Sequence, residues 1–104
     1  MVEETLHHRG TTLVRRLMLA PGEASRWHRD PFLRVSIVFK GEALLIEFRD
    51  GCPSVRVAVT PGEVDWDEPG DRVHRAVNIA GIVYEEVTIF FLSDPNDIPQ
   101  PDAH

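Results

Sequence analysis

Two blocks of residues in this 104-residue chain carry side chains suited to catalysis or ligand binding, and each block starts at a glycine. The first block consists of Gly22, His28, Asp30, Arg34 and Gly41, and the second of Gly62, Pro69, Gly70, His74 and Asn78. Imidazoles and carboxylates bind transition metals and transfer protons, and a guanidinium binds carboxylates. The residue types therefore indicate metal binding, proton transfer or the capture of an anion.

Short strands must position these side chains, because turn signals interrupt the chain at short intervals, as in Pro21-Gly22, Lys40-Gly41 and Pro61-Gly62. Between the turns lie runs rich in β-branched and apolar residues, and no segment keeps a helical apolar period. The predicted strands are residues 11–20, 34–40, 43–48, 55–60, 64–66, 73–79 and 83–92. Short strands at this spacing are typical of an all-β sandwich or barrel.

Alternation within the strands predicts which side chains face inward. Arg34, Ser36 and Val38 share one face of their strand, and this mixture suits an interior that narrows from a polar site to a packed floor. The opposite set, Val35, Ile37 and Phe39, is expected in a core or an interface. The 83–92 run is almost continuously apolar, which predicts a central strand.

The spacing of the two blocks resembles the motifs of the cupin superfamily, G-x5-H-x-H-x3-E-x6-G and G-x5-P-x-G-x2-H-x3-N. The first block keeps every spacing, whereas the second has one extra residue before His74. The resemblance covers about residues 11–92 and implies a single-domain cupin-type β-barrel (a jelly roll, or double-stranded β-helix). Residues 1–104 would then form one domain, with an N-terminal arm at 1–10 and a Pro/Asp-rich tail at 93–104.

In the family, three histidines and a glutamate hold a divalent metal, and this chain departs from that set at two positions. Asp30 replaces the second histidine and Arg34 replaces the glutamate. One interpretation is a metal site of His28, Asp30 and His74 that holds Fe, Mn, Ni or Zn. The other is a metal-free cavity, favoured by Arg34 because a guanidinium cannot bind a metal. There, Arg34 would hold an anion while His28 or His74 transfers a proton.

Two further residues are candidates for contacts with a substrate. Trp66 could face the cavity and shape it, although a plain core tryptophan is the commoner outcome. Glu85 shares a strand face with Val83 and Val87, so it could point into an apolar space. There it could either pair with an arginine or act as an acid or base.

The resemblance implies a small cupin enzyme of dioxygenase, isomerase or lyase type that acts on a small polar or anionic metabolite. The strand pattern and the length are most similar to small cupins tagged as beta-alanine degradation proteins. The alternative is a non-catalytic cupin module that binds or senses a small carboxylate, because two histidines and an arginine suffice to capture one.

Charge and composition bear on partners and location. The net charge of −6 and the scattered basic residues argue against binding to nucleic acid or to anionic membranes. The single cysteine and the acidic, signal-free N-terminus predict a cytoplasmic protein. Cupin barrels commonly pair, so the resemblance implies a homodimer, and the outward apolar set is compatible with such an interface.

Overall fold

The computed structural model describes residues 1–97, and in that range it contains eight strands and no helix. In chain order the strands are β1 (Val2–Arg9), β2 (Thr12–Leu19), β3 (Leu33–Lys40), β4 (Ala43–Phe48), β5 (Val55–Ala58), β6 (Val64–Asp67), β7 (His74–Asn78) and β8 (Tyr84–Phe91). All seven predicted strands are present, with ends within two residues of those predicted. No helix in the described range is long and apolar enough to cross a membrane.

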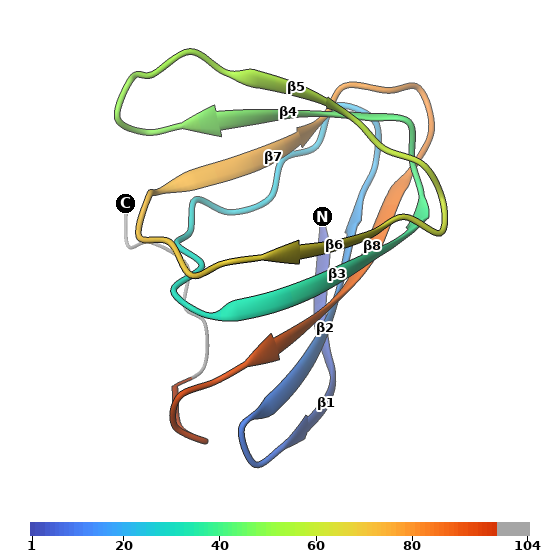
Figure 1. Ribbon diagram of the computed structural model, residues 1–104. Coiled ribbons are helices and arrows are strands. Elements are labelled where there is room, and N and C mark those ends of the chain that lie inside the picture. The colour runs from blue at the N-terminus through green and yellow to red at the C-terminus, as the bar shows by residue number, and fades with distance from the viewer. Residues whose placement is uncertain (98–104) are drawn as a thin grey trace.

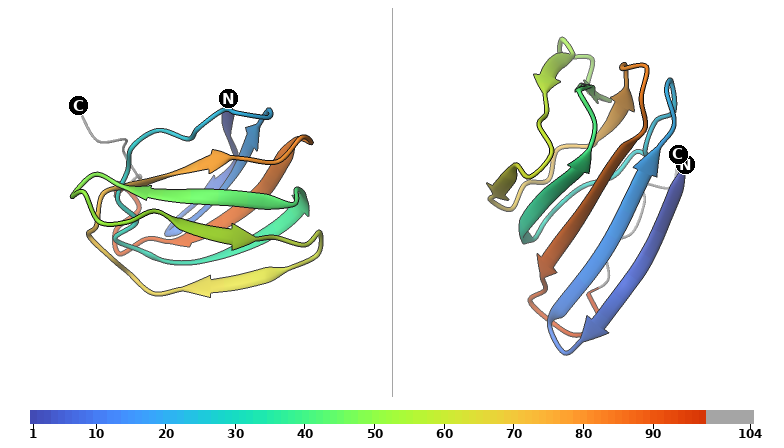
Figure 2. Two further views of the ribbon diagram at one scale, coloured as in Figure 1. Left: turned by 90° about the horizontal axis from the view of Figure 1, so that it is seen from above. Right: turned by 90° about the vertical axis from the view of Figure 1, so that its right-hand side faces the viewer.

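The strands form two antiparallel sheets that face each other across the interior (Figure 1). The larger sheet has the order β1-β2-β8-β3-β6 and the smaller has the order β5-β4-β7. Figure 2 shows the smaller sheet lying over the larger one, with β5 at the edge of the smaller sheet that is away from β7. The all-β prediction is confirmed, and so is the central place of β8, which pairs with both β2 and β3.

The N-terminal residues do not form the expected arm. Residues Val2–Arg9 pair with β2 along its whole length and extend the larger sheet by one strand. Every side chain of β1 is exposed, and this polar pattern gave no signal of a buried face. An edge strand held by backbone hydrogen bonds needs little apolar periodicity, which explains why the sequence did not reveal it.

The C-terminal tail was expected to start at residue 93. Residues 93–97 contain no strand. The rest of the predicted tail, 98–104, lies outside the described residues.

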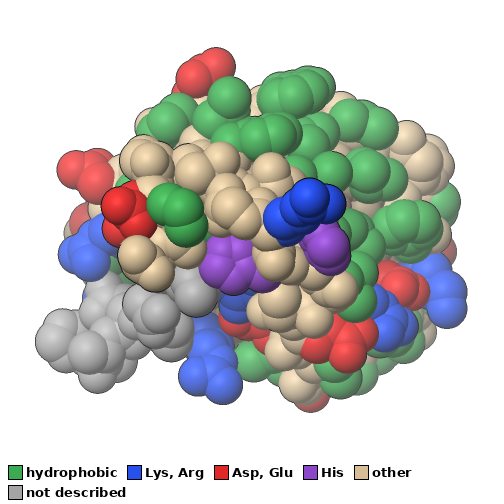
Figure 3. Space-filling view, turned by 90° about the horizontal axis from the view of Figure 1, so that it is seen from below, with side chains coloured by type: hydrophobic (Ala, Val, Ile, Leu, Met, Phe, Trp, Pro, Cys, Tyr) green, Lys and Arg blue, Asp and Glu red, His purple; other side chains and the backbone are tan. Residues whose placement is uncertain are grey.

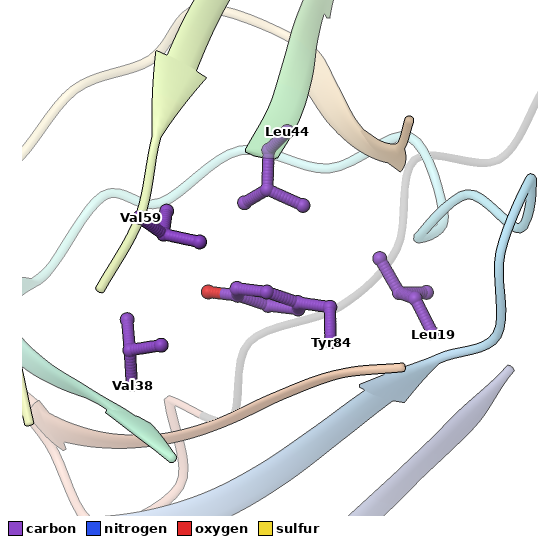
Figure 4. Close-up of a cluster of buried hydrophobic side chains, with 5 residues drawn as sticks. All are labelled: Leu19, Val38, Leu44, Val59 and Tyr84. Atoms are coloured by element: carbon purple, nitrogen blue, oxygen red, sulfur yellow. The ribbon is translucent and has the colours of Figure 1, made fainter. Parts of the chain in front are cut away.

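A hydrophobic cluster closes one end of the space between the sheets (Figure 4). It consists of Leu19, Val38, Leu44, Val59 and Tyr84, which come from both sheets and are each at most 9% exposed. Burying side chains of this size contributes about 2 kcal/mol each before entropy is counted. The cluster is the packed floor that the β3 pattern predicted.

Gly41, the last residue of the first block, is required by this floor. It has φ = +141°, and an added Cβ would lie 2.7 Å from Cδ1 of Tyr84. Only a residue without a side chain allows the chain to turn from β3 into β4 against the tyrosine ring.

Candidate metal centre

The two sequence blocks are joined directly by their backbones. The segment before β3 runs antiparallel to β7, and His28 and His74 form a two-residue bridge. The amide of His28 donates to the carbonyl of His74 at 2.9 Å, and the amide of His74 donates back at 3.0 Å. Side chains of such a pair project to the same side, and the two imidazole centroids lie 4.5 Å apart.

Asp30 lies between the two imidazoles. Its Oδ2 is 3.3 Å from Nε2 of His28 and 3.1 Å from Nε2 of His74. The residue is only 9% exposed, and its backbone carbonyl accepts a hydrogen bond from the amide of Gly70. One donor atom from each of these three residues therefore lies within 4.8 Å of the others, which is a geometry that could hold a metal ion.

The other ring nitrogens fix how the two imidazoles are protonated. Nδ1 of His28 lies 2.6 Å from the carbonyl oxygen of Arg26, and Nδ1 of His74 lies 2.9 Å from that of Arg72. A carbonyl only accepts hydrogen bonds, so both Nδ1 atoms carry the proton. In the neutral rings, the lone pairs of both Nε2 atoms then point at the carboxylate of Asp30, and a cation or added protons must lie between them.

Arg34 approaches the same carboxylate from β3. Its Nη2 lies 3.6 Å from Oδ2 of Asp30 and 3.9 Å from Oδ2 of Asp67. Its Nη1 donates to the carbonyl of Glu68 at 3.4 Å. Arg34 therefore forms ion pairs with two carboxylates, those of Asp30 and Asp67.

The electrostatics of the cluster keep Asp30 ionised. Burial acts to raise its pKa, but hydrogen bonds from both imidazoles and the positive charges of His28 and Arg34 lower the pKa well below its usual range. Burial likewise acts to lower the pKa of His28, yet the hydrogen bond and charge of Asp30 outweigh burial and raise it. The ionised carboxylate of Asp30 thus stabilises positively charged groups at this point in the barrel.

The cluster opens into a cavity of about 520 Å³ between the two sheets, a size typical of small-molecule sites. His28, Asp30, Arg34 and His74 line it together with Ser36 and Val38 of β3, so the predicted inward face is confirmed. Apolar residues of the smaller sheet, including Leu44 and Ile46, cover the opposite side.

The sequence matches no protein-family model and no curated protein. Solved structures do resemble this chain. A cupin domain protein from Bordetella pertussis superposes with a TM-score of 0.78 at 22% identity, covering 88% of this chain and 93% of that one. The cupin motifs, the two facing sheets and this superposition agree. This chain has the cupin fold.

Other structures share the cupin fold at similar identity. A double-stranded β-helix protein from Klebsiella pneumoniae matches with a TM-score of 0.71 at 18% identity, covering 99% of this chain and 84% of that one. Oxalate oxidase in complex with the substrate analogue glycolate matches with a TM-score of 0.60 at 23% identity. That match covers 83% of this chain but only 44% of the oxidase.

The cupin barrel excludes two of the predicted substrate contacts from its cavity. Trp66 points outward from β6, is 65% exposed and stacks on Phe91 with centroids 6.0 Å apart. Glu85 points outward from β8 and is held by Arg16 at 2.8 Å. The two corrections have different causes. Both faces of β8 are largely apolar, so alternation alone does not tell which one is inside. On β6 the face that lines the cavity is the acidic one, with Asp65 and Asp67, and the apolar face with Trp66 lies outside.

The residue next to Glu85 was the one that sequence reasoning missed. Glu86 lines the cupin cavity, and its Oε2 accepts a hydrogen bond of 2.8 Å from the hydroxyl of Thr88. That hydroxyl lies 2.8 Å from the hydroxyl of Ser36 on β3. Ser36 had been placed on the inward face, but the sequence did not show that β8 pairs with β3, so it gave no signal that Glu86 shares this face.

Proposed function

We propose that this protein is a small cupin enzyme that holds a divalent transition metal at His28, Asp30 and His74 and acts on a small carboxylate. The observation that carries the proposal is the convergence of both Nε2 atoms on one ionised carboxylate while both Nδ1 atoms bind backbone carbonyls. Backbone partners of this kind orient metal-binding histidines in many proteins.

The donor set fits such an ion. Two imidazoles and one carboxylate form the triad used by iron(II) sites with open coordination positions. Neighbouring ligands of an ion bonded at about 2.1 Å lie about 3 Å apart, and the Nε2–Oδ2 distances are 3.3 and 3.1 Å. When bound, the ion would polarise a substrate oxygen or hold a reactant at an open position.

The remaining groups of the site favour an anionic substrate. Arg34 is only partly neutralised, because its distances to Asp30 and Asp67 are 3.6 and 3.9 Å, longer than direct hydrogen bonds. A carboxylate entering the cavity could therefore form charge-assisted hydrogen bonds with the guanidinium. Oxalate oxidase, which shares the fold, was solved with glycolate, a small carboxylate of this kind.

Glycolate binding tests the proposal. Titration calorimetry of the purified protein, with and without added Mn²⁺, should show binding that Arg34→Gln weakens by about tenfold, the value of one charged hydrogen bond. Lys40→Gln is the matched control, because it also removes one cationic side chain, and Lys40 is an exposed residue outside the cavity. Binding that is equal in Arg34→Gln and in the wild type would contradict the assignment of Arg34.

A second candidate is the non-catalytic module that senses or carries a carboxylate without a metal. It is favoured by one observation, the guanidinium within 4 Å of the Asp30 carboxylate, since a positive charge there opposes a cation. Glycolate binding that is independent of Mn²⁺, in a protein that retains no metal, would decide for this alternative.

We also propose that the protein forms a homodimer through the outward face of the larger sheet. Trp66 and Phe91 stack there, and Val64 and Phe39 are more than half exposed nearby on β6 and β3. Figure 3 shows one face of the molecule, where hydrophobic side chains gather across the upper part of the view and acidic, basic and histidine side chains lie mainly below them. Trp66→Glu should convert a dimer into a monomer in sedimentation velocity, and a monomeric wild type at high concentration would refute the proposal.

A further inference from the structure

The second polar group in the cavity is the hydroxyl chain that ends on Glu86. The hydroxyl of Thr88 donates to Glu86, so it accepts a hydrogen bond from Ser36, and the chain is directed toward the carboxyl group. Within residues 1–97, no arginine or lysine forms an ion pair with Glu86. The neighbouring Glu85, in contrast, is paired with Arg16 on the outer face.

The strand register sets how far this group lies from the level of Arg34. Arg34 lies opposite Phe90 across the β3–β8 ladder, Ser36 opposite Thr88, and Val38 opposite Glu86. Four residues separate Phe90 from Glu86, which is about 13 Å of extended strand. The guanidinium of Arg34 therefore lines the cavity at one level of the β3–β8 ladder. The carboxyl group of Glu86 lines it two inward-facing residue pairs further along, toward the floor.

The charged residues that lie between the level of Arg34 and the level of Glu86 do not cancel this separation of positive from negative charge. Arg15, which lies opposite Thr88 on β2, forms an ion pair with Glu3 of β1. Asp65 of β6 lies opposite Ser36 and adds a second carboxylate to the cavity lining. The half of the cavity near Glu86 therefore carries an excess of acidic groups.

We infer that Glu86 determines specificity in this cavity by binding an ammonium group at the far end of a ligand whose carboxylate is held at Arg34 and the histidines. The inference rests on the proposed function, because binding of the ligand's carboxylate at Arg34 is part of that proposal. The substrate class is then a linear amino carboxylate, in which the two charged ends are separated by several carbons. The Glu86 carboxyl group accepts a hydrogen bond from the ammonium, and Thr88 and Ser36 hold it in place.

Burial raises the pKa of Glu86, and hydrogen bonding to the carboxyl group, with Thr88 as the first contributor, offsets that effect only in part. An ammonium ion supplies the missing positive charge and stabilises the ionised carboxylate. A neutral ligand end, such as a methyl group, would leave the carboxyl group without that partner.

Titration calorimetry with 5-aminopentanoate and pentanoate tests the inference, because the two probes differ only at the far end. The wild type should bind 5-aminopentanoate about tenfold more tightly than pentanoate. Glu86→Gln should abolish this preference, because it removes the carboxylate that binds the ammonium group. Glu85→Gln is the matched control on the outer face and should keep the preference. Thr88→Val provides a second test if Glu86→Gln does not fold, and it should reduce the preference.

The outcomes separate this inference from the proposed function. Equal binding of both probes to the wild type, or an intact preference in Glu86→Gln, would overturn the role of Glu86 alone. If pentanoate and 5-aminopentanoate both fail to bind, the carboxylate site at Arg34 fails as well, and both proposals are overturned.

Discussion

The backbones of His28 and His74 are joined by a reciprocal pair of hydrogen bonds of 2.9 and 3.0 Å. This pair brings two residues that are far apart in the sequence to adjacent positions, and it uses no side-chain atom. We therefore expect His28→Ala to remove an imidazole and leave the bridge intact. The free energy of unfolding, measured in urea, should fall by no more than about 1 kcal/mol. A loss of several kcal/mol would mean that the side chain, and not the backbone, holds the two segments together.

Reversing the charge at Arg34 should strengthen metal binding and weaken anion binding. Arg34→Glu removes the cation near Asp30 and restores the residue type that the cupin motif has at this position. The affinity for Mn²⁺ or Co²⁺ should rise by about tenfold or more. A cobalt titration followed by visible absorption measures it. Metal affinity that is unchanged in Arg34→Glu would show that the guanidinium does not oppose the ion.

Asn78 is a structural residue, and its loss should cost stability. It is 1% exposed, and its side-chain amide donates to the carbonyls of Leu19 and Ile82 at 2.9 and 2.8 Å. Asn78→Ala leaves the buried carbonyl of Leu19 unsatisfied and removes the donor to the partly buried carbonyl of Ile82, so the free energy of unfolding should fall by about 3 kcal/mol. Asn96→Ala, at an exposed position, is the control and should change it by less than about 0.5 kcal/mol. Similar effects of both substitutions would refute the role of Asn78.

The two glycines that bound the first block should differ in their tolerance of alanine. Both have positive φ, but a Cβ at Gly22 meets no atom within 4 Å, whereas one at Gly41 lies 2.7 Å from the Tyr84 ring. Gly22→Ala should cost about 1 kcal/mol from backbone strain alone. Gly41→Ala should cost at least about 2 kcal/mol more, because it also displaces the floor of the cavity. Thermal unfolding of the two variants compares them, and the reverse order would be inconsistent with the packing of Tyr84.

Glu86 should make stability depend on pH. Its pKa is raised in the folded state, mainly by burial, so the folded protein binds more protons than the unfolded one above the ordinary pKa of 4.5. The stability that the protonated group contributes is complete below that pKa and is lost as the pH rises through the folded-state pKa. Relative to the wild type, Glu86→Gln should therefore become more stable as the pH rises above 4.5. Parallel urea-unfolding profiles of the two proteins across this range would contradict the shift.

Sequence reasoning succeeded where two independent patterns agreed. Turn residues and β-branched runs located seven strands, and the glycine-to-histidine spacing related them to a known barrel. The cluster of His28, Asp30, Arg34 and His74 followed from that spacing and is present in the structure.

The errors arose where one pattern stood alone. Alternation along β8 separated Glu85 from Glu86, but without the position of β3 it could not show which of them faces the cavity. β1 was missed because its pairing with β2 depends on backbone groups, which are the same for every residue type. The choice between a metal and a bare anion site depends on distances of a few tenths of an ångström, and no spacing rule specifies these.

The metal content of the protein shows whether His28, Asp30 and His74 hold an ion. Elemental mass spectrometry of untagged protein, purified without chelator, should find iron, manganese, nickel or zinc near one equivalent per chain. His28→Ala and His74→Ala should lose it, and His7→Ala, at an exposed position on β1, should retain it. A wild-type protein that contains no metal and takes up none when it is dialysed against these ions would contradict the account.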